Sequence, residues 1–448
     1  MTTVLFADRD GASLGPLGER VVPALLPLQS VPALERMLEA LVRADLRAAL
    51  LVVGPGSREV KRRFGKGIRW GIALEYVERE GEETSGDVLR RLEPRLDGDT
   101  LVFRADVGAH AAVGEFVDAV ASRTAPVVAG TTGGRPIGFF RLKPGAVKKV
   151  ELPREPAAEG WALGEDHEPL PLETAVTLLD SVASYRAADA PEAPSVSPRA
   201  GVDPKAKLLA GTSVAEESVV LAGARLSGVS VLPRTVIPAG VELADAVVSG
   251  NLVVDAKTGE ASLLTDRLPP ASGRHVAGVA DRIAGVLALL LSLPLWPVAF
   301  LWALVANAGH PTGRLRLNGN GAGGAREPFS TFRFETAVPV LRDLPLLLAL
   351  SAGRLALSGV APLPPEEEAA LHAGWERTRL EAPVGLLSAS RLLVPAAAPD
   401  EVARVVDAFE ARRPVGGLVG TALGALFGAK GWVAPKAWNP DQIPEASS

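Results

Sequence analysis

Residues 283–305 form a run of twenty-three residues without a charged side chain. As one straight helix this run would be about 35 Å long, enough to cross the hydrocarbon core of a bilayer. Ser292, Pro294 and Pro297 lie in its middle, and each proline removes a backbone donor, so a bend is expected there. The run predicts a membrane helix that spans the bilayer or returns to the face it entered. The alternative is a buried helix of a soluble core, but so long an apolar run is typical of membranes.

Charge around the run is uneven. Residues 266–333 contain seven arginines and only three acidic residues, whereas the whole chain has a net charge of −5. The local excess fits an anionic leaflet or phosphate groups, with a solvated basic face as the alternative. The acidic total gives no reason to expect a nucleic-acid partner. Arginines on both flanks of the run, Arg282 before it and Arg314 and Arg316 after it, favour a re-entrant helix with both ends in the cytoplasm.

Length and composition limit the remaining possibilities. A chain of 448 residues with 47% hydrophobic side chains has room for two to four domains with real cores. Cysteine is absent, so disulfides and thiolate sites are excluded. The first residues show neither a basic region nor a long apolar stretch, so no signal peptide is expected. These features predict a protein of the cytoplasmic membrane whose soluble domains face the cytoplasm.

The first 186 residues alternate between strand-like and helix-like patterns. Strand candidates lie at 3–7, 49–53, 72–77, 100–104 and 126–129, and apolar residues recur at helical spacing over 34–46. Such alternation predicts an α/β domain with a largely parallel sheet over residues 1–186. Ligands of such sheets bind at the carboxyl ends of the strands.

Two segments of this domain resemble the sugar nucleotidyltransferases, or NDP-sugar pyrophosphorylases. They are VVPALLPL at 21–28 and FGKGIRWGIALEYVERE at 64–80. The resemblance implies that Asp106, in the sequence FRADV, stands at a metal-binding aspartate, with Mg²⁺ as the cofactor. The alternative for Asp106 is an ordinary carboxylate at the end of a strand.

The same domain departs from that family where the phosphates would bind. The family has a glycine-rich G-x-G-T-R loop, and this chain reads ADRDGASLGPL at 7–17. The family also has a lysine where Pro23 stands. We therefore expect the domain to keep the fold and to lack the pyrophosphorylase chemistry, with at most weak nucleotide binding near Asp106.

A repeat follows a segment at 187–207 that is rich in Pro, Ala and Ser and is predicted to be a linker. Residues 208–250 form seven units of about six residues, each with an aliphatic first position and a small or β-branched fifth position. The first positions are Leu208, Val214, Val220, Leu226, Val231, Ile237 and Leu243. This hexapeptide pattern predicts a short left-handed parallel β-helix, with a run of unrelated short strands as the alternative. Stacked repeats need neighbours, so the short stub should be capped by a partner protein or by oligomerisation.

Residues 275–395 resemble the bacterial sugar transferases, the monotopic phosphoglycosyl transferases that act on polyprenyl phosphate. The family's K-F-R-[ST]-M motif appears as RFETA, starting at Arg333, and its L-D-E-L-P…G-P-R-P motif extends over 341–362. A re-entrant helix broken at a serine–proline step matches Ser292 and Pro294. The resemblance implies sugar-nucleotide and undecaprenyl phosphate substrates, with Arg333 and Arg354 binding substrate.

Departures from this second family fall on its charged residues. The Asp-Glu pair that follows the first motif is missing, and Arg342 and Asp343 occupy the Asp-Glu places of L-D-E-L-P. Glu335 replaces an arginine, and Ala361 replaces the arginine of G-P-R-P. Phosphoglycosyl transfer through a covalent intermediate needs a carboxylate nucleophile and cations around the diphosphate. Glu335 and Asp343 are the two carboxylates that remain as candidates.

The sequence thus predicts an α/β nucleotidyltransferase-like domain, a short left-handed parallel β-helix and a membrane-embedded α+β sugar-transferase-like domain, followed by a helical tail at 396–448. The leading function is a sugar-transferase-family membrane protein in cell-surface polysaccharide biosynthesis, which transfers or helps to transfer a sugar phosphate from a sugar nucleotide to polyprenyl phosphate. One alternative is a non-catalytic scaffold of the polysaccharide assembly machinery. Another is a membrane-tethered sugar nucleotidyltransferase.

Overall fold

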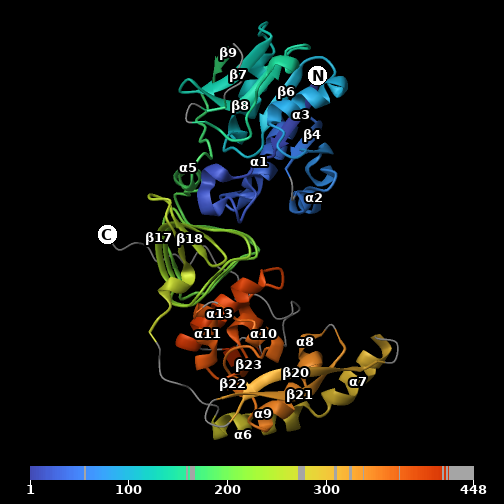
Figure 1. Cartoon of the computed structure of the whole chain (residues 1–448), viewed down its shortest axis with the longest axis vertical. Helices are drawn as coiled ribbons and strands as arrows, with labels where there is room; N and C mark the ends of the chain where they lie inside the picture. Colours follow the sequence, from blue (N-terminus) through green and yellow to red (C-terminus); the bar gives the residue numbers. More distant parts are fainter. Residues whose placement is uncertain are drawn as a thin grey trace.

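A computed structural model of the chain describes residues 1–54, 57–157, 160–161, 167–270, 278–306, 310–321, 325–336, 338–372, 374–415, 418–419 and 422. Three parts follow one another along the long axis of the molecule (Figure 1). The α/β domain lies at one end and a coil of short strands lies in the middle. The C-terminal domain, formed by the described residues from 278 onward, lies at the other end.

A seven-stranded sheet in the order β5-β4-β1-β6-β8-β7-β9 forms the centre of the α/β domain. Neighbours among β5, β4, β1 and β6 are parallel, as the alternating pattern predicts, while β8 is antiparallel to both β6 and β7. The strands are β1 (Thr2–Ala7), β4 (Ala48–Val53), β5 (Ala73–Glu78), β6 (Thr100–Arg104), β7 (Val127–Thr132), β8 (Arg135–Leu142) and β9 (Glu168–Pro171). The helices are α1 (Ala33–Arg43), α2 (Arg58–Phe64), α3 (Ser85–Leu92) and α4 (Val113–Val120).

Burial explains why these segments form strands and helices. Val4, Leu5 and Phe6 on β1 are all fully buried, as expected for a central parallel strand covered on both faces. On α1 the buried side chains recur at helical spacing and pack against the sheet. They are Leu34, Met37, Leu38 and Leu41.

The middle part is a coil of parallel strands. Each strand pairs with the strand 17 or 18 residues further along the chain: Ser195 with Ser213, Ser213 with Ser230, and Ser230 with Val247. That offset corresponds to three units of about six residues per turn. Six of the seven aliphatic first positions are buried, and Leu208 is half-buried. The short strands are β10 (Ser195–Val196), β11 (Gly201–Val202), β12 (Lys207–Leu208), β13 (Ser213–Val214), β14 (Val219–Val220), β15 (Arg225–Val231), β16 (Val236–Ile237) and β17 (Glu242–Ser249).

The prediction of a linker at 187–207 is wrong, because the structure has strands of the coil there. β10, β11 and β12 lie within it and pair in parallel with β13, β14 and β15. The coil therefore starts before the first predicted unit at Leu208. Proline and serine are frequent at the corners of this coil, and their abundance gave the segment the composition of a linker.

Three elements cover the coil and attach it to its neighbours. An antiparallel extension, β18 (Leu252–Asp255) and β19 (Ala261–Leu263), continues the sheet from β17. Helix α13 (Asp400–Arg412) adds Val405 and Phe409 to the apolar core of the coil. On the side of the α/β domain, α5 (Val182–Ala188) is followed by Asp189, whose buried carboxylate accepts hydrogen bonds from Ser213 and Ser230.

The C-terminal domain is built around one long hairpin. Strands β20 (Thr312–Asn320) and β21 (Arg326–Phe334) pair in antiparallel register along their full length. Leu315, Leu317 and Phe329 pack against α9, and Phe332 and Phe334 pack against α7. The helices are α6 (Val279–Ser292), α7 (Leu295–Ala306), α8 (Pro339–Asp343), α9 (Leu346–Ser351), α10 (Pro365–Ala369), α11 (Gly374–Arg377) and α12 (Ala389–Leu393). Two short strands, β22 (Ala356–Ser358) and β23 (Gly385–Leu387), pair in parallel.

The predicted membrane run forms the bent pair α6–α7 at the end of the molecule away from the α/β domain (Figure 1). The two helices meet at a bend of 66°. Among the described residues no single helix is long and apolar enough to cross a membrane, although the bent pair passes that test when its two halves are taken together. Most of the predicted tail, at 416–417, 420–421 and 423–448, lies outside the described residues.

Candidate functional site

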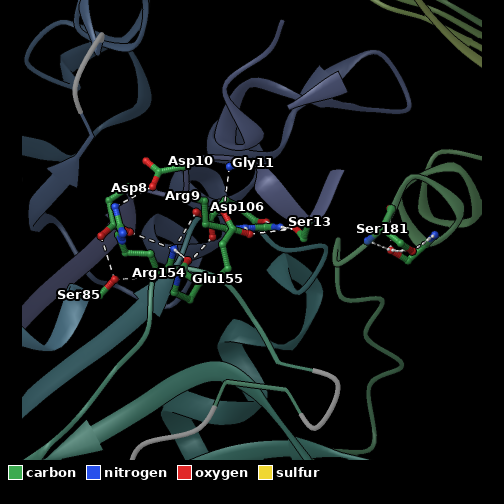
Figure 2. Close-up of polar contacts among 12 residues, drawn as sticks. Asp8, Arg9, Asp10, Gly11, Ser13, Ser85, Asp106, Arg154, Glu155 and Ser181 are labelled. Carbon is green, nitrogen blue, oxygen red and sulfur yellow. Dashed lines mark hydrogen bonds and ion pairs between the residues drawn. The ribbon is translucent and has the colours of Figure 1, made fainter. Parts of the chain in front are cut away.

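Charged residues gather where β1 and β6 end side by side. β1 is followed by Asp8, Arg9 and Asp10, whereas β6 ends at Arg104 and is followed two residues later by Asp106. The two strands are parallel neighbours, so their carboxyl ends lie at the same edge of the sheet. Figure 2 shows Asp8, Arg9 and Asp106 close to one another at this edge. This is the edge where α/β sheets bind their ligands.

The Arg104 guanidinium lies at the centre of the site. Its Nε and Nη2 donate to the two carboxylate oxygens of Asp106 at 3.2 and 3.0 Å, and Nη2 lies 3.0 Å from Asp8. Nη1 donates to the Ser85 hydroxyl at 2.9 Å, and Nη2 also donates to the Arg154 carbonyl. The side chains of Arg104, Asp8 and Asp106 are completely buried. Such a two-pronged, charge-assisted contact is among the strongest polar contacts in proteins.

Burial governs the protonation of this cluster. Burial raises the pKa of the Asp8 carboxyl, against the attraction of Arg104. Burial alone would lower the pKa of Arg104, but the Asp106 and Asp8 carboxylates outweigh it, so that pKa lies above its usual value. The guanidinium therefore stays charged and remains the fixed cation of the cluster.

The loop after β1 is held by a second arginine and by Glu155. Arg9 donates from Nε to Glu155 at 3.0 Å, from Nη1 to the Asp106 carbonyl at 2.9 Å, and from Nη2 to Ser13 at 2.6 Å. The backbone N–H of Gly11 donates to the other oxygen of Glu155 at 2.8 Å. A carboxylate of this chain thus takes the loop N–H that a phosphate-binding loop would offer to its ligand.

Asp10 completes the network at its outer edge. It accepts from Arg79 and from Arg154, each at 2.7 Å, and Arg154 also reaches Glu82 at the exposed rim. Four arginines therefore face four carboxylates at the strand ends, which leaves the inner network without net charge. They are Arg9, Arg79, Arg104 and Arg154, and Asp8, Asp10, Asp106 and Glu155.

Apolar side chains fix the same loop from the other side. The short helix η1 (Ala12–Leu17) buries Leu14 and Leu17 in a cluster shared with α5 and the coil. Gly11 and Gly18 close the loop so tightly that a Cβ on Gly18 would lie 2.0 Å from the Gly11 carbonyl oxygen. A pocket of about 240 Å³ remains beside the loop, and Pro23 lines it where the resembling family has a lysine.

The surroundings of Asp106 do not fit the implied Mg²⁺. Mg²⁺ takes oxygen ligands in octahedral geometry, and both carboxylate oxygens of Asp106 already accept from Arg104. Within the described part of the chain no group of three or more His, Asp or Glu side chains could hold a metal ion. A metal at Asp106 would have to displace a buried guanidinium that carries a charge of its own.

Comparison with known proteins shows similarity at the level of structure. No protein-family model and no curated protein sequence matches the chain. A solved structure described as a glucose-1-phosphate thymidylyltransferase from Bacillus anthracis, in complex with sucrose, is similar over 42% of this chain and 94% of its own length. The identity is 14% and the TM-score is 0.35.

The candidate carboxylates of the C-terminal domain lie near the end of β21 and in α8. Glu335 accepts from Arg333 at 3.1 Å, so the structure brings these two predicted residues together. Asp343 accepts from the neighbouring Arg342 at 3.0 Å and also from Arg391 of α12. The hydrogen bond that Arg342 donates to Asp343 raises the pKa of Arg342, and the charge of Glu335 adds to the effect, so both carboxylates lie in the field of one guanidinium.

Arg354 lies apart from that group. It donates to Glu327 on β21 at 2.6 Å, close to the end of the hairpin where residues 322–324 are outside the described range. The predicted substrate-binding pair, Arg333 and Arg354, therefore contacts two different carboxylates at opposite ends of β21.

The predicted break of the membrane run lies between α6 and α7. Ser292 is the last residue of α6, and its hydroxyl donates to the Leu289 carbonyl at 2.9 Å. The same hydroxyl accepts from the Trp296 indole at 3.2 Å across the bend. Pro294 stands between the two helices, where its missing N–H breaks no helical hydrogen bond.

Sequence reasoning identified Asp106 but missed Arg104, Arg9 and Glu155. The strand 100–104 was predicted, yet an arginine at the end of a strand is usually solvent-exposed. The usable signal was the pair of charged clusters DRD and RAD after two predicted parallel strands, since such ends meet at one edge of a sheet.

Proposed function

We propose that this chain is a non-catalytic, membrane-attached scaffold of cell-surface polysaccharide assembly, in which the nucleotidyltransferase-like domain and the coil serve as binding surfaces. The single observation that carries the proposal is the closed network of four arginines and four carboxylates at the strand ends. The role in polysaccharide assembly rests on the sequence resemblances alone.

The network opposes catalysis for an electrostatic reason. Nucleotidyl transfer releases a diphosphate, so the site must offer cations and N–H groups to the charge that develops there. Here all three side-chain nitrogens of Arg9 already donate within the protein, to Glu155, Ser13 and the Asp106 carbonyl, and the Gly11 N–H donates to Glu155. A nucleotide would therefore have to displace Glu155 from both Arg9 and the Gly11 N–H before its phosphates could bind there.

Membrane attachment is supported by the outer face of the α6–α7 pair. Its large apolar side chains are exposed, with Leu291 at 83% and Val305 at 85%. A soluble surface rarely exposes so many large apolar side chains on two neighbouring helices. Arg282, Arg314 and Arg316 lie near its ends, as expected for contact with anionic headgroups. The exposed set is Ile283, Val286, Leu287, Leu290, Leu291, Leu293, Leu295, Val298, Phe300, Leu301, Trp302, Leu304 and Val305.

Pyrophosphate exchange tests the proposal directly. The full-length protein in detergent is incubated with labelled pyrophosphate, Mg²⁺ and each sugar nucleotide in turn. We expect no label in nucleoside triphosphate above the protein-free background. Robust exchange by the unaltered protein would contradict the proposal, and its loss in Asp106→Ala would assign the activity to this domain.

Phosphoglycosyl transfer is the second candidate function. The observation in its favour is that Glu335 and Asp343 both lie within the field of Arg342, with Arg333 and Arg391 beside them. Such an arrangement offers a carboxylate among cations, as a diphosphate substrate requires. Release of nucleoside monophosphate from a sugar nucleotide in the presence of polyprenyl phosphate would support this second function.

A further inference from the structure

Arg104 holds the position that a bridging metal ion would hold between two aspartates. Its Nη2 lies 3.0 Å from an oxygen of Asp8 and 3.0 Å from an oxygen of Asp106. All three side chains are excluded from solvent. Two buried carboxylates at the ends of neighbouring strands repel one another, and a cation between them is required for both to remain charged.

The surroundings are shaped for a guanidinium and not for a hydrated ion. Gly138 on β8 leaves room for the arginine stem, since a Cβ there would lie 2.4 Å from the Arg104 Cγ. The Trp161 ring lies with its centroid 4.0 Å from the guanidinium carbon, which is a cation–π distance. An aromatic face offers nothing to a cation that needs six oxygen ligands.

The remaining donors of Arg104 are also used. The Ser85 hydroxyl accepts a hydrogen bond from Nη1 and donates one to Asp8 at 2.8 Å. Ser85 thus links the arginine to Asp8 a second time. The Arg154 carbonyl accepts from Nη2 at 3.1 Å. Every nitrogen of the guanidinium therefore has an oxygen partner, and this cation cannot leave without exposing several buried polar groups.

We propose that Arg104 is a built-in cation that replaces the divalent metal of the resembling family, so that the α/β domain folds and binds its ligands without metal. The inference deepens the proposed function and rests on it in part, since a site without metal is also a site without metal-assisted phosphoryl chemistry. The two can fail separately, because a chain that binds no metal could still show exchange, and one that binds metal could still show none.

The first test uses the unaltered full-length protein in detergent. It is titrated with MnCl₂ alone and then with MnCl₂ and UTP, and binding is followed by electron paramagnetic resonance of free Mn²⁺. We expect no saturable Mn²⁺ binding that depends on Asp106, and no shift in Tm on adding EDTA. Saturable binding that disappears in Asp106→Asn would overturn the proposal.

The second test removes the built-in cation. Arg104→Ala removes the cation between Asp8 and Asp106, so we expect Mn²⁺ to bind the variant at least ~10-fold tighter than any binding to the wild type and to raise the Tm of the variant. Arg141→Ala is the matched control, since Arg141 is also buried in this sheet but contacts a single carboxylate, Asp99 at 3.4 Å, besides donating to the Arg123 carbonyl.

The control should lose stability without gaining Mn²⁺ binding. A folded Arg104→Ala protein whose Mn²⁺ affinity equals that of the wild type would show that the guanidinium does not stand in for a metal. If Arg104→Ala does not fold at all, the wild-type titration and Asp106→Asn decide the matter alone.

Discussion

Glu410 lies inside the C-terminal domain, one helical turn after Asp407, and both carboxylates are buried. The Glu410 carboxylate accepts from the Ala389 N–H at 2.8 Å, and burial raises its pKa to about 9. The folded protein therefore keeps a proton on Glu410 up to about pH 9, while the unfolded chain loses it near pH 4.5. Between these values folding takes up a proton, so the stability falls as the pH rises.

Glu410→Gln should remove that pH dependence. The wild type should lose at most roughly 4 kcal/mol of unfolding free energy between pH 5 and pH 8, at about 1.4 kcal/mol per pH unit, and the variant should lose less. Urea unfolding in detergent at the two pH values measures the unfolding free energy of the wild type and of the variant. Glu381→Gln is the control, because Glu381 pairs with Arg412 at the surface. Equal pH dependence in wild type and Glu410→Gln would contradict the assignment.

Variants of Glu335 and Asp343 in the C-terminal domain distinguish a scaffold from an enzyme. Glu335→Gln and Asp343→Asn keep the size of each side chain. If the protein is a scaffold, both variants should therefore still complement a polysaccharide defect about as well as the wild type. A phosphoglycosyl transferase that depends on a carboxylate should lose several orders of magnitude in activity from one of these changes. Complementation is scored with protein level and membrane fraction measured alongside. Loss of glycan at unchanged protein level would refute the scaffold.

Single residues of the α/β site show what the sequence could reveal. Asp106 was identifiable because it follows a predicted strand, and the family resemblance implied that it binds a metal. Arg104 was not, because its partners Asp8, Ser85 and Trp161 come from distant segments, and only the folded sheet brings them together. A buried ion pair depends on tertiary structure, so local patterns give little information about it.

At the scale of elements, the proposed membrane attachment of the bent pair α6–α7 can be tested through the position of its flanks. If the pair is re-entrant, both flanks face the cytoplasm. The chain has no cysteine, so Arg282→Cys and Arg316→Cys each introduce a single label site. We expect neither to react with a membrane-impermeant maleimide added to intact cells, and both to react after lysis. Labelling of either one in intact cells would rule out the re-entrant arrangement.

Elements with a local period were predictable, and those held by distant contacts were not. The inward positions of the coil follow from the six-residue repeat, and those from Val214 to Leu243 are buried. The handedness of the coil stays a prediction. Its first strands, such as β10, were missed because the segment 187–207 is rich in Pro, Ala and Ser and has the composition of a linker. Strands β8 and β9 were missed because Pro136, Gly138 and Pro169 interrupt their patterns.

At the scale of the whole molecule, ion pairs join the α/β domain to the coil. Arg63 of α2 pairs with Glu216, and Arg234 of the coil pairs with Glu59 of α2 at 3.0 Å. Arg20 reaches Glu401 of α13 at 2.6 Å. These pairs line a pocket of about 420 Å³ where the three parts meet. Because they are partly exposed, salt should weaken them.

Glu216→Gln should loosen this junction. The change removes one of the two carboxylate partners of Arg63 and of Arg199, and we expect a loss of roughly 1 kcal/mol in docking with faster hydrogen exchange in α2. Wild-type protein in about 1 M salt, where the Debye length is about 3 Å, should show the same change. Glu242→Gln alters an exposed residue of the same coil and serves as the control. If α2 exchanges equally fast in both variants, the ion pairs do not hold the junction.

Helix α13 covers the coil although it lies near the other end of the chain. On the ribosome, the strands of the coil emerge well before Val405 and Phe409, which complete their apolar core. The apolar helices α6 and α7 are synthesised in between. Contacts between such distant segments form late, so the core of the coil stays incomplete until α13 has been synthesised. If α6 and α7 attach to a bilayer, as proposed above, attachment precedes final assembly of the middle of the molecule, and a prematurely terminated chain would leave that core open.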